Sequence, residues 1–266
     1  MTIDNIHIAF CFLTANASGV PHQAAVWQRF LTSMEDGDGV FLHAKFIPND
    51  DDDSATTWWR EHATWIRPTV STRWGDVSIV RATLALFDTA FRATTPTTTH
   101  FMLLSESCIP LWSLADMRDI IAATPNAPSW LMAGQASDCD RWRHARVDPQ
   151  KWPWQDFLKQ HQWMLLRRDD VAFFLQHQDA VEDFQNVPIP DEHVFASLLA
   201  RHQRPFLCRL PTFVRWRPHQ AHPDSFDVVD DALLREARRS SLFLRKVRPD
   251  TRMCPDAVTQ PIRRDG

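Results

Sequence analysis

Uninterrupted apolar runs alternate with amphipathic stretches along most of this chain. The runs have the length of strands that are buried on both faces, and they occupy residues 6–14, 40–44, 101–104, 129–133 and 162–166. Between them, apolar residues at helical spacing predict helices over residues 22–33, 74–94, 114–121, 169–178 and 191–201. Strand, helix and strand in succession form the unit of a parallel sheet. The pattern therefore predicts an α/β fold with helices flanking a central, mostly parallel sheet.

The last third of the chain is less regular. It predicts a short strand at residues 212–214 and a helix from Asp230 that leads into residues 242–246. The end, from Arg248 onward, is polar and is expected to be frayed. We therefore predict a single domain over residues 1–250 and a polar tail over residues 251–266.

The run at residues 101–104 is the centre of this pattern because polar residues follow it at once. Ser105, Glu106 and Ser107 come directly after the run, and Pro110 prevents a continuing central strand. Ligands bind in the crevice outside the carboxyl ends of parallel strands, which is where these three side chains are expected. A polar turn that only caps the strand explains the same residues equally well.

The composition excludes some partners. Apolar residues make up 44% and charged residues 23% of the 266 positions, as in globular proteins. The net charge of −4 gives no general attraction for nucleic acid or an anionic membrane, so a phosphate-bearing ligand needs a local basic site. No apolar run approaches the roughly 18 residues of a membrane span. We predict no nucleic-acid partner and no membrane span.

The cysteines and the first residues bear on the compartment. The five cysteines are widely spaced without a CxxC pair, which argues against a disulfide framework and a cysteine-rich zinc site. The apolar run at residues 6–13 follows Asp4 rather than basic residues, and it lacks the pattern of a secretory signal. We expect a reducing, cytoplasmic location.

A series of short blocks carries a family resemblance. Residues 103–111, Leu-Leu-Ser-Glu-Ser-Cys-Ile-Pro-Leu, form the closest match. The other matching blocks are Ile8-Ala9-Phe10, Phe12-Leu13-Thr14, Trp27-Gln28-Arg29-Phe30, Trp74-Gly75-Asp76-Val77-Ser78, Gln162-Trp163, Pro190-Asp191-Glu192-His193, Thr212-Phe213-Val214-Arg215-Trp216, His222-Pro223 and Phe243-Leu244-Arg245-Lys246. In this order, over about residues 6–248, they resemble the core-2/I-branching β-1,6-N-acetylglucosaminyltransferase family, glycosyltransferase family 14, especially its plant-type branch.

The resemblance implies a GT-A-like fold and an inverting transfer from a nucleotide sugar to a hydroxyl, with no required metal. The family's general base is the Glu of its Pro-Asp-Glu segment, which falls on Glu192. Its Lys on the leaving diphosphate falls on Lys246, with Arg245 beside it. The carboxylates of Asp191 and Glu192 also have a simpler interpretation as caps at a helix start.

The remaining site residues follow from the same resemblance. Ser105 and Glu106 lie where metal-dependent GT-A enzymes keep an Asp-x-Asp motif, so we expect them near the donor sugar. The family's acceptor-site Trp falls on Trp216, and we place Asp191 in the acceptor site too. A position of Trp216 in the hydrophobic core explains this residue equally well. The second basic diphosphate contact of the animal enzymes falls near His222, where no arginine aligns, so the candidates to replace it are His222, Arg217 and Arg245.

Two acidic segments are candidates for a metal ion. Residues 49–53 carry adjacent carboxylates, although such charges are more often merely exposed. Asp138 and Asp140 have the Asp-x-Asp spacing of many glycosyltransferases, but they do not directly follow an apolar strand. They lie in an irregular polar and aromatic segment, residues 134–154, of a kind that is usually functional or disordered. The histidines show no ligand spacing, and we predict no metal and no other cofactor.

The donor and the acceptor remain open at this stage. Members of the family use UDP-GlcNAc, UDP-xylose and UDP-glucuronic acid, and we expect GlcNAc. The acceptor is expected to be a saccharide or glycoconjugate. The cysteines, membrane anchor and stem of secreted relatives are largely missing, which argues against a Golgi glycoprotein as acceptor.

Two other functions fit the same residues. One is a catalytically inactive, transferase-like domain that binds a glycan or a partner. The other is a glycoside hydrolase that uses Glu106 and Glu192, which requires two carboxyl groups roughly 5–10 Å apart across a sugar.

Overall fold

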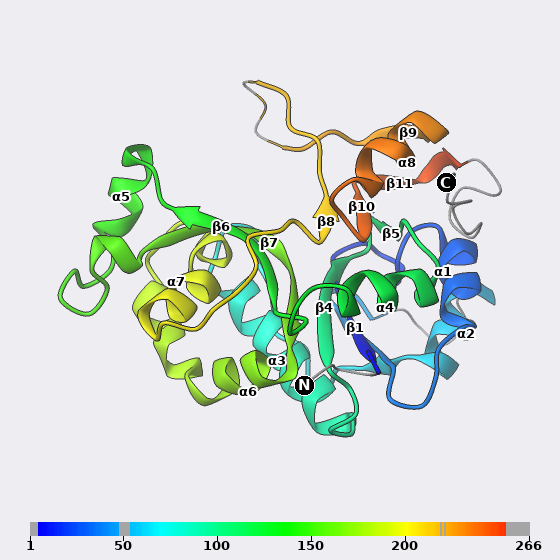
Figure 1. Ribbon diagram of the computed structural model, residues 1–266, viewed down its shortest axis with the longest axis horizontal. Helices are drawn as coiled ribbons and strands as arrows, with labels where there is room; N and C mark the ends of the chain where they lie inside the picture. Colours follow the sequence, from blue (N-terminus) through cyan, green and yellow to red (C-terminus); the bar gives the residue numbers. More distant parts are fainter. Residues whose placement is uncertain (1–4, 48–53, 219, 221, 254–266) are drawn as a thin grey trace.

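The computed structural model describes residues 5–47, 54–218, 220 and 222–253, which form one large sheet and two small ones (Figure 1). The large sheet has the order β3 (Thr64–Trp65), β2 (Gly39–Ala44), β1 (Ile8–Thr14), β4 (His100–Ser105), β7 (Leu158–Arg167), β6 (Trp130–Gln135). The first four strands are parallel, and β7 runs antiparallel to both of its neighbours. The predicted α/β class with a mostly parallel central sheet is confirmed, and it is consistent with a GT-A-like fold.

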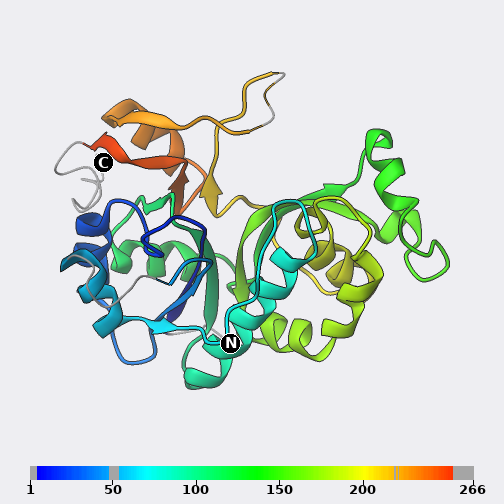
Figure 2. The same ribbon diagram turned by 180° about the vertical axis from the view of Figure 1, so that it is seen from behind.

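Helices cover both faces of this sheet. One apolar layer contains α3 (Ser78–Ala93), α6 (Arg168–Gln176) and α7 (Val194–Arg201), and α3 lies against α6 (Figure 2). The other layer contains α1 (Ala24–Leu31), α2 (Ser54–His62) and α4 (Leu114–Ala122). The connections add α5 (Arg141–His144) and the 3-10 turns η1 (Asp138–Asp140), η2 (Trp154–Asp156), η3 (Gln178–Phe184) and η4 (Pro190–Glu192).

The packing of β1 explains why the apolar runs are continuous. Ala9 and Cys11 pack into the layer that contains α3, whereas Ile8, Phe10 and Phe12 pack into the layer that contains α1. All five side chains are fully buried. A strand that is covered on both faces needs an apolar residue at every position, as the sequence predicted.

The C-terminal part forms the two small sheets. The first has the order β5 (Cys108–Pro110), β10 (Phe243–Arg245), β8 (Thr212–Phe213), and the second pairs β9 (Phe226–Val229) with β11 (Val247–Met253). The predicted helix after Asp230 is α8 (Asp231–Arg238), and the Asp230 carboxylate caps it by accepting from the Leu233 N–H at 2.9 Å. The expectation of a frayed end from Arg248 is wrong as far as Met253, because β11 pairs with β9 up to that residue.

Several predicted boundaries shift. β7 begins at Leu158 because the polar residues 159–161 continue the strand, and α7 begins only at Val194, after η4. From the sequence, Asp169 or Asp170 is expected to cap α6, but the helix has no side-chain cap; the buried Asp170 carboxylate instead accepts hydrogen bonds from Ser129 Oγ at 2.5 Å and Arg204 Nε at 2.8 Å. The sequence pattern indicated neither α2 nor β3. The acidic segment at residues 49–53 lies outside the described residues.

Trp27 of α1 joins the large sheet to the three-stranded sheet. Its buried ring stacks on Phe243 of β10, with centroids 6.0 Å apart, and meets Phe12 of β1 edge-on at 4.8 Å. Its indole N–H donates to the Cys108 carbonyl of β5 at 2.9 Å. Because β10 ends at Arg245, this packing also fixes the position of that arginine.

Trp27→Ala is expected to lower the free energy of unfolding by about 3–5 kcal/mol, because it removes a buried ring and the hydrogen bond to Cys108. Trp142→Ala is the control: that ring is 52% exposed, and the expected change is below about 1 kcal/mol. Urea denaturation of both variants measures the difference. Equal losses in the two variants would show that Trp27 does not join the sheets.

Candidate active site

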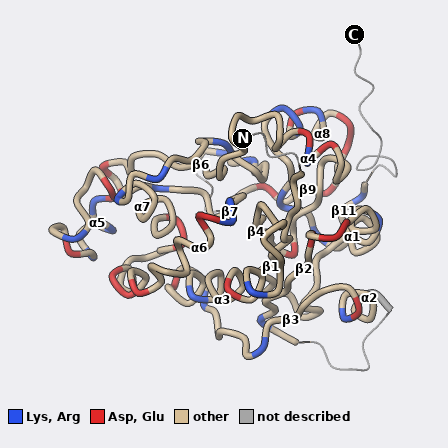
Figure 3. Tube along the Cα trace, turned by 60° about the horizontal axis from the view of Figure 1, so that its bottom comes forward, with Lys and Arg blue, Asp and Glu red and all other residues tan. Residues whose placement is uncertain are grey.

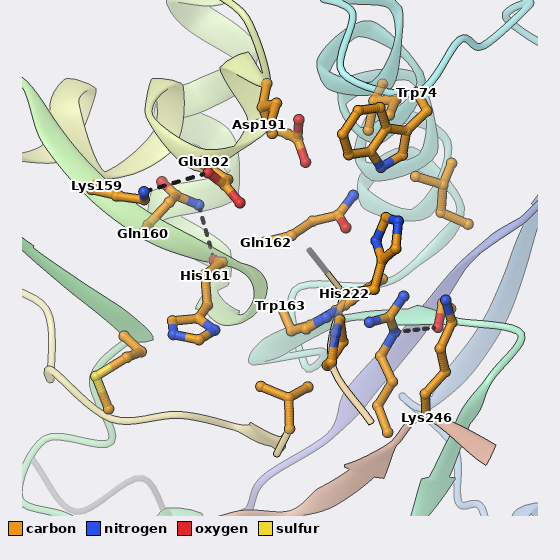
Figure 4. Close-up of a pocket in the computed structure, with 18 of the residues that line it drawn as sticks. Trp74, Lys159, Gln160, His161, Gln162, Trp163, Asp191, Glu192, His222 and Lys246 are labelled. Atoms are coloured by element: carbon orange, nitrogen blue, oxygen red, sulfur yellow. Dashed lines mark hydrogen bonds and ion pairs between the residues drawn. The ribbon is translucent and has the colours of Figure 1, made fainter. Parts of the chain in front are cut away.

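A cleft of about 970 Å³ lies at the carboxyl ends of the parallel strands (Figure 4). Thr14 ends β1, Lys45 follows β2 and Ser105 ends β4, and all three line it. The antiparallel strand β7 begins at this edge of the sheet and contributes residues 159–163. This is the position at which open α/β sheets bind ligands.

All the residues that the sequence assigned to a site line this one cleft. They come from five separate parts of the chain and are Ser105, Glu106, Asp191, Glu192, Trp216, His222, Arg245 and Lys246. Neither Asp138 nor Asp140 lines it. The structure therefore brings the predicted residues together in one cleft.

The Ser-Glu-Ser turn connects β4 with the small sheet. Ser105 Oγ lies 3.0 Å from Ser107 Oγ and accepts a hydrogen bond from Arg245 Nε at 3.2 Å. The Glu106 backbone carbonyl accepts from the His22 N–H at 2.7 Å, while its side chain lines the cleft. The turn therefore ends the strand, as the simpler interpretation holds, and also presents a carboxylate to the cleft.

Two adjacent cations lie at the end of β10, where Arg245 is its last residue and Lys246 follows it. Arg245 lies over the Trp163 ring, 4.7 Å from its centroid, and burial lowers the pKa of its guanidinium. Burial and the neighbouring Arg245 also lower the pKa of Lys246, against the opposing effect of Glu106. Among the described residues, Lys246 has no ion-pair partner, so its ammonium group is available to an anion in the cleft.

A strained turn directs Asp191 and Glu192 into the cleft. Ile189 has a φ of 54°, a left-handed conformation that is unfavourable for a β-branched residue, and its N–H donates to the Gly75 carbonyl at 2.9 Å. Neither η4 nor α7 has a side-chain cap, so the interpretation of the two carboxylates as helix caps is wrong.

Glu192 is held by cations that the sequence analysis did not identify. Its Oε2 accepts a hydrogen bond from Arg143 Nη1 at 3.0 Å and lies 4.0 Å from Lys159 Nζ. Its side chain remains 30% exposed. Arg143 lies in the segment at residues 134–154 that composition marked as functional or disordered, but no sequence pattern predicted its pairing with Glu192.

Asp191 is buried in the wall of the cleft. It is only 6% exposed, and its Oδ1 has no hydrogen-bond partner among the described residues. Burial raises the pKa of this carboxyl to about 6, and the neighbouring Glu192 adds to the effect. A buried carboxyl oxygen without a hydrogen-bond partner is costly unless a ligand supplies one.

Aromatic side chains surround part of the cleft. Trp74 is 72% exposed and Trp216 49% exposed, and both line it. The His222 ring meets Trp74 edge-on with centroids 6.1 Å apart. The interpretation of Trp216 as a core residue is therefore wrong, and its exposed face fits stacking on a sugar ring.

The Asp-x-Asp segment does not present two carboxylates to the cleft. The exposed Asp138 pairs with Arg141 at 2.8 Å, whereas the buried Asp140 pairs with Lys159 at 3.3 Å and Arg143 at 3.6 Å. Across residues 5–47, 54–218, 220 and 222–253, no group of three or more His, Cys, Asp or Glu side chains is arranged to hold a metal ion.

Comparisons with known proteins place the chain in a family. The family model of the core-2/I-branching enzyme matches residues 8–238, which include Ser105, Glu106, Asp191, Glu192 and most of the other cleft residues. Arg245 and Lys246 lie beyond the matched residues.

The chain is also similar to a rice protein, "Glycosyltransferase BC10" of Oryza sativa subsp. japonica. The identity is 22% over 227 residues, which make up 74% of this chain and 54% of the relative. The chain thus spans about half the length of that curated relative. Within the described residues, no helix combines the length and apolar character needed to cross a membrane. Because the family model matches most of its length, the chain belongs to the core-2/I-branching enzyme family.

Proposed function

We propose that this protein is an inverting, metal-independent glycosyltransferase. It moves a sugar, with GlcNAc as the first choice, from a UDP-sugar to a hydroxyl of a saccharide or glycoconjugate. The observation that carries the proposal is the placement of Glu192 and Lys246 on separate walls of one cleft (Figure 4). An inverting transfer needs a proton acceptor on the attacking side and positive charge on the leaving side.

The donor is proposed to bind between the ends of β1 and β4 on one side and the cations Arg245 and Lys246 on the other. Lys246 is proposed to contact the leaving diphosphate, because burial and the neighbouring Arg245 make its cation costly until an anion binds beside it. Arg245 already contacts Ser105 and Trp163, so it is proposed to shape this site and to add positive charge near the diphosphate without contacting it. Glu106 is proposed to contact the donor sugar.

Lys246 and Arg245 are also the reason to propose that no metal is required. The charge that develops on the diphosphate needs stabilisation, and fixed ammonium and guanidinium groups supply it without an ion. His222 lies at the same cleft and is proposed to act as a further diphosphate contact, in place of the arginine that does not align.

The acceptor is proposed to bind between Glu192 and the exposed face of Trp216. Glu192 takes the proton of the attacking hydroxyl, and Trp216 stacks on the acceptor sugar. Asp191 Oδ1, which has no hydrogen-bond partner among the described residues, is proposed to accept a hydrogen bond from a hydroxyl of the acceptor sugar.

Membership of the plant-type branch and a cytoplasmic location belong to the same proposal. The rice relative, which is named a glycosyltransferase, supports the plant-type branch. The wide spacing of the cysteines supports a reducing compartment. A non-catalytic glycan-binding domain would not need the proton acceptor, so loss of activity on changing Glu192 alone distinguishes it from an enzyme.

Glu192→Gln is expected to fold normally and to lower kcat about 10²- to 10⁴-fold, because it removes the proton acceptor but keeps the shape of the side chain. Glu182→Gln, an exposed member of an ion pair with Arg81, is the control and should keep full activity. Transfer from UDP-GlcNAc to a panel of saccharides, followed by mass spectrometry, gives the rates. Near-normal turnover in Glu192→Gln would rule out this base.

Lys246→Ala is expected to weaken UDP binding about 10- to 100-fold, because a hydrogen bond to a charged group contributes about 1.5–3 kcal/mol. Lys246→Arg should retain most of the affinity. Isothermal titration calorimetry with UDP, in the presence of EDTA, measures both variants and the unmodified protein. Loss of UDP binding by the unmodified protein in EDTA would contradict the metal-independent proposal.

Asp191→Asn is expected to stabilise the protein at pH 8. Because burial raises the Asp191 pKa to about 6 from an ordinary value of 3.8, the stability that its protonated form contributes at low pH is lost as the pH rises through 6. At pH 8 the ionised carboxylate costs about 3 kcal/mol, which asparagine avoids. Urea denaturation from pH 4 to 8 should show that the variant has the larger free energy of unfolding at pH 8, and that this difference from the parent disappears toward pH 4. A difference independent of pH would contradict this account.

A further inference from the structure

The two acids of the Asp-Cys-Asp segment differ completely in their surroundings. The Asp138 side chain is 87% exposed and pairs with Arg141 on the surface. The Asp140 side chain is 4% exposed and lies behind the wall of the cleft, among the cations that contact Glu192. Figure 3 shows charges of both signs along this η1–α5 segment. Asp140 is therefore part of a charge cluster for which the proposed function does not yet account.

Arg143 is the member of this cluster that touches Glu192. Its Nη1 donates to Glu192 Oε2 at 3.0 Å and to His193 Nε2 at 3.2 Å, which uses both hydrogens of that nitrogen. Asp140 Oδ1, at 3.6 Å, is an ion-pair partner beyond hydrogen-bond distance. The Arg143 side chain is only 11% exposed, so few alternative positions are open to it.

His193 keeps Arg143 in place because it is fixed as a neutral acceptor. Its Nδ1 lies 2.8 Å from the Leu158 carbonyl and must donate there, which leaves Nε2 to accept from Arg143. Burial lowers the pKa of His193 to about 4, and Arg143 lowers it further. The ring also stacks on Phe157 with centroids 4.4 Å apart. Arg143 therefore approaches Glu192 from one direction.

Asp140 balances the two cations that face Glu192. Its Oδ1 lies 3.3 Å from Lys159 Nζ, and its Oδ2 accepts from Ser137 Oγ at 3.0 Å. Burial would raise the pKa of Asp140, but Ser137, Lys159 and Arg143 together hold it below its ordinary value, so the carboxylate is ionised. Two cations and two carboxylates then share the cluster. Without Asp140, uncompensated positive charge would oppose proton uptake by the neighbouring carboxylate.

We propose that Arg143 and Asp140 are positioning residues for the general base: Arg143 orients Glu192, and Asp140 holds Arg143 and Lys159 and balances their charge. This inference rests on the proposed function of Glu192. It assigns to Asp140 a role through Arg143 and Lys159 instead of a role as a metal ligand. Both of its carboxylate oxygens already have partners within the protein.

The test compares kcat and KM for Asp140→Asn and Asp138→Asn with those of the unmodified protein. Asp140→Asn is expected to lower kcat about 10- to 100-fold and to leave the KM for the nucleotide sugar within about threefold, because the base is misplaced while the donor site is intact. Asp138→Asn, from the same segment, should match the unmodified protein. Thermal melting of both variants shows whether they fold.

Two further comparisons separate positioning from general structural damage. In a Glu192→Gln background, adding Asp140→Asn should lower kcat by less than about threefold. A residue that acts through Glu192 has no base left to position in that background. Arg143→Lys, which keeps the cation, should retain more kcat than Arg143→Gln. A full additional loss in the double variant would overturn the inference, as would equal loss in the two Arg143 variants.

The remaining outcomes distinguish this inference from the function on which it rests. Transfer by the unmodified protein that depends on Glu192 but not on Asp140 would overturn the inference and leave the proposed function standing. EDTA could also abolish activity, with Mn²⁺ restoring it in the unmodified protein but not in Asp140→Asn. That result would make Asp140 a metal ligand and would overturn the inference too. If the unmodified protein transfers no sugar from any UDP-sugar while Glu192 is intact, both proposals fail.

Discussion

The burial of β1 and β4 on both faces is the constraint on which the rest of the structure depends. Because apolar layers cover the two strands from both sides, polar residues can begin only where the strands end. Both ends lie at the same edge of the sheet, since the strands are parallel and in register from Ile8 and His100 onward. Thr14 and Ser105 therefore mark the floor of the cleft, and every later segment that reaches it approaches this edge.

Separate supports hold the two charged walls of the cleft. Trp27 packs against Phe243 and fixes β10, so the cations Arg245 and Lys246 are held from the side of α1. Glu192 is held from the other half of the sheet, through η4 and the buried Arg143. The positions of Glu192 and Lys246 therefore depend on packing in different parts of the fold. Within the part of the chain that the structure describes, Asp191 Oδ1 has no hydrogen-bond partner and Lys246 has no ion-pair partner, so the cleft keeps groups that cost stability where ligands are proposed to bind.

The sequence predicted the class of the fold and the membership of the cleft well, for a physical reason. Continuous apolar runs allow only strands covered on both faces, and the block that ends β4 places Ser105 and Glu106 at the ligand edge. The start of β7 was missed because residues 159–161 are polar and carry no apolar pattern. Arg143 and Asp140 were not recognised because their partners are 49 and 19 residues away along the chain. Only the folded arrangement brings these charges together.

The stereochemistry of the product distinguishes an inverting glycosyltransferase from the other functions considered. The protein would be incubated with UDP-GlcNAc, UDP-xylose or UDP-glucuronic acid and a panel of saccharide acceptors in EDTA, and the products examined by NMR. The account predicts a new β-linked glycoside from one of these α-linked donors, with UDP released. An α-linked glycoside, free sugar with UDP and no glycoside, or a product that forms only without EDTA would contradict it.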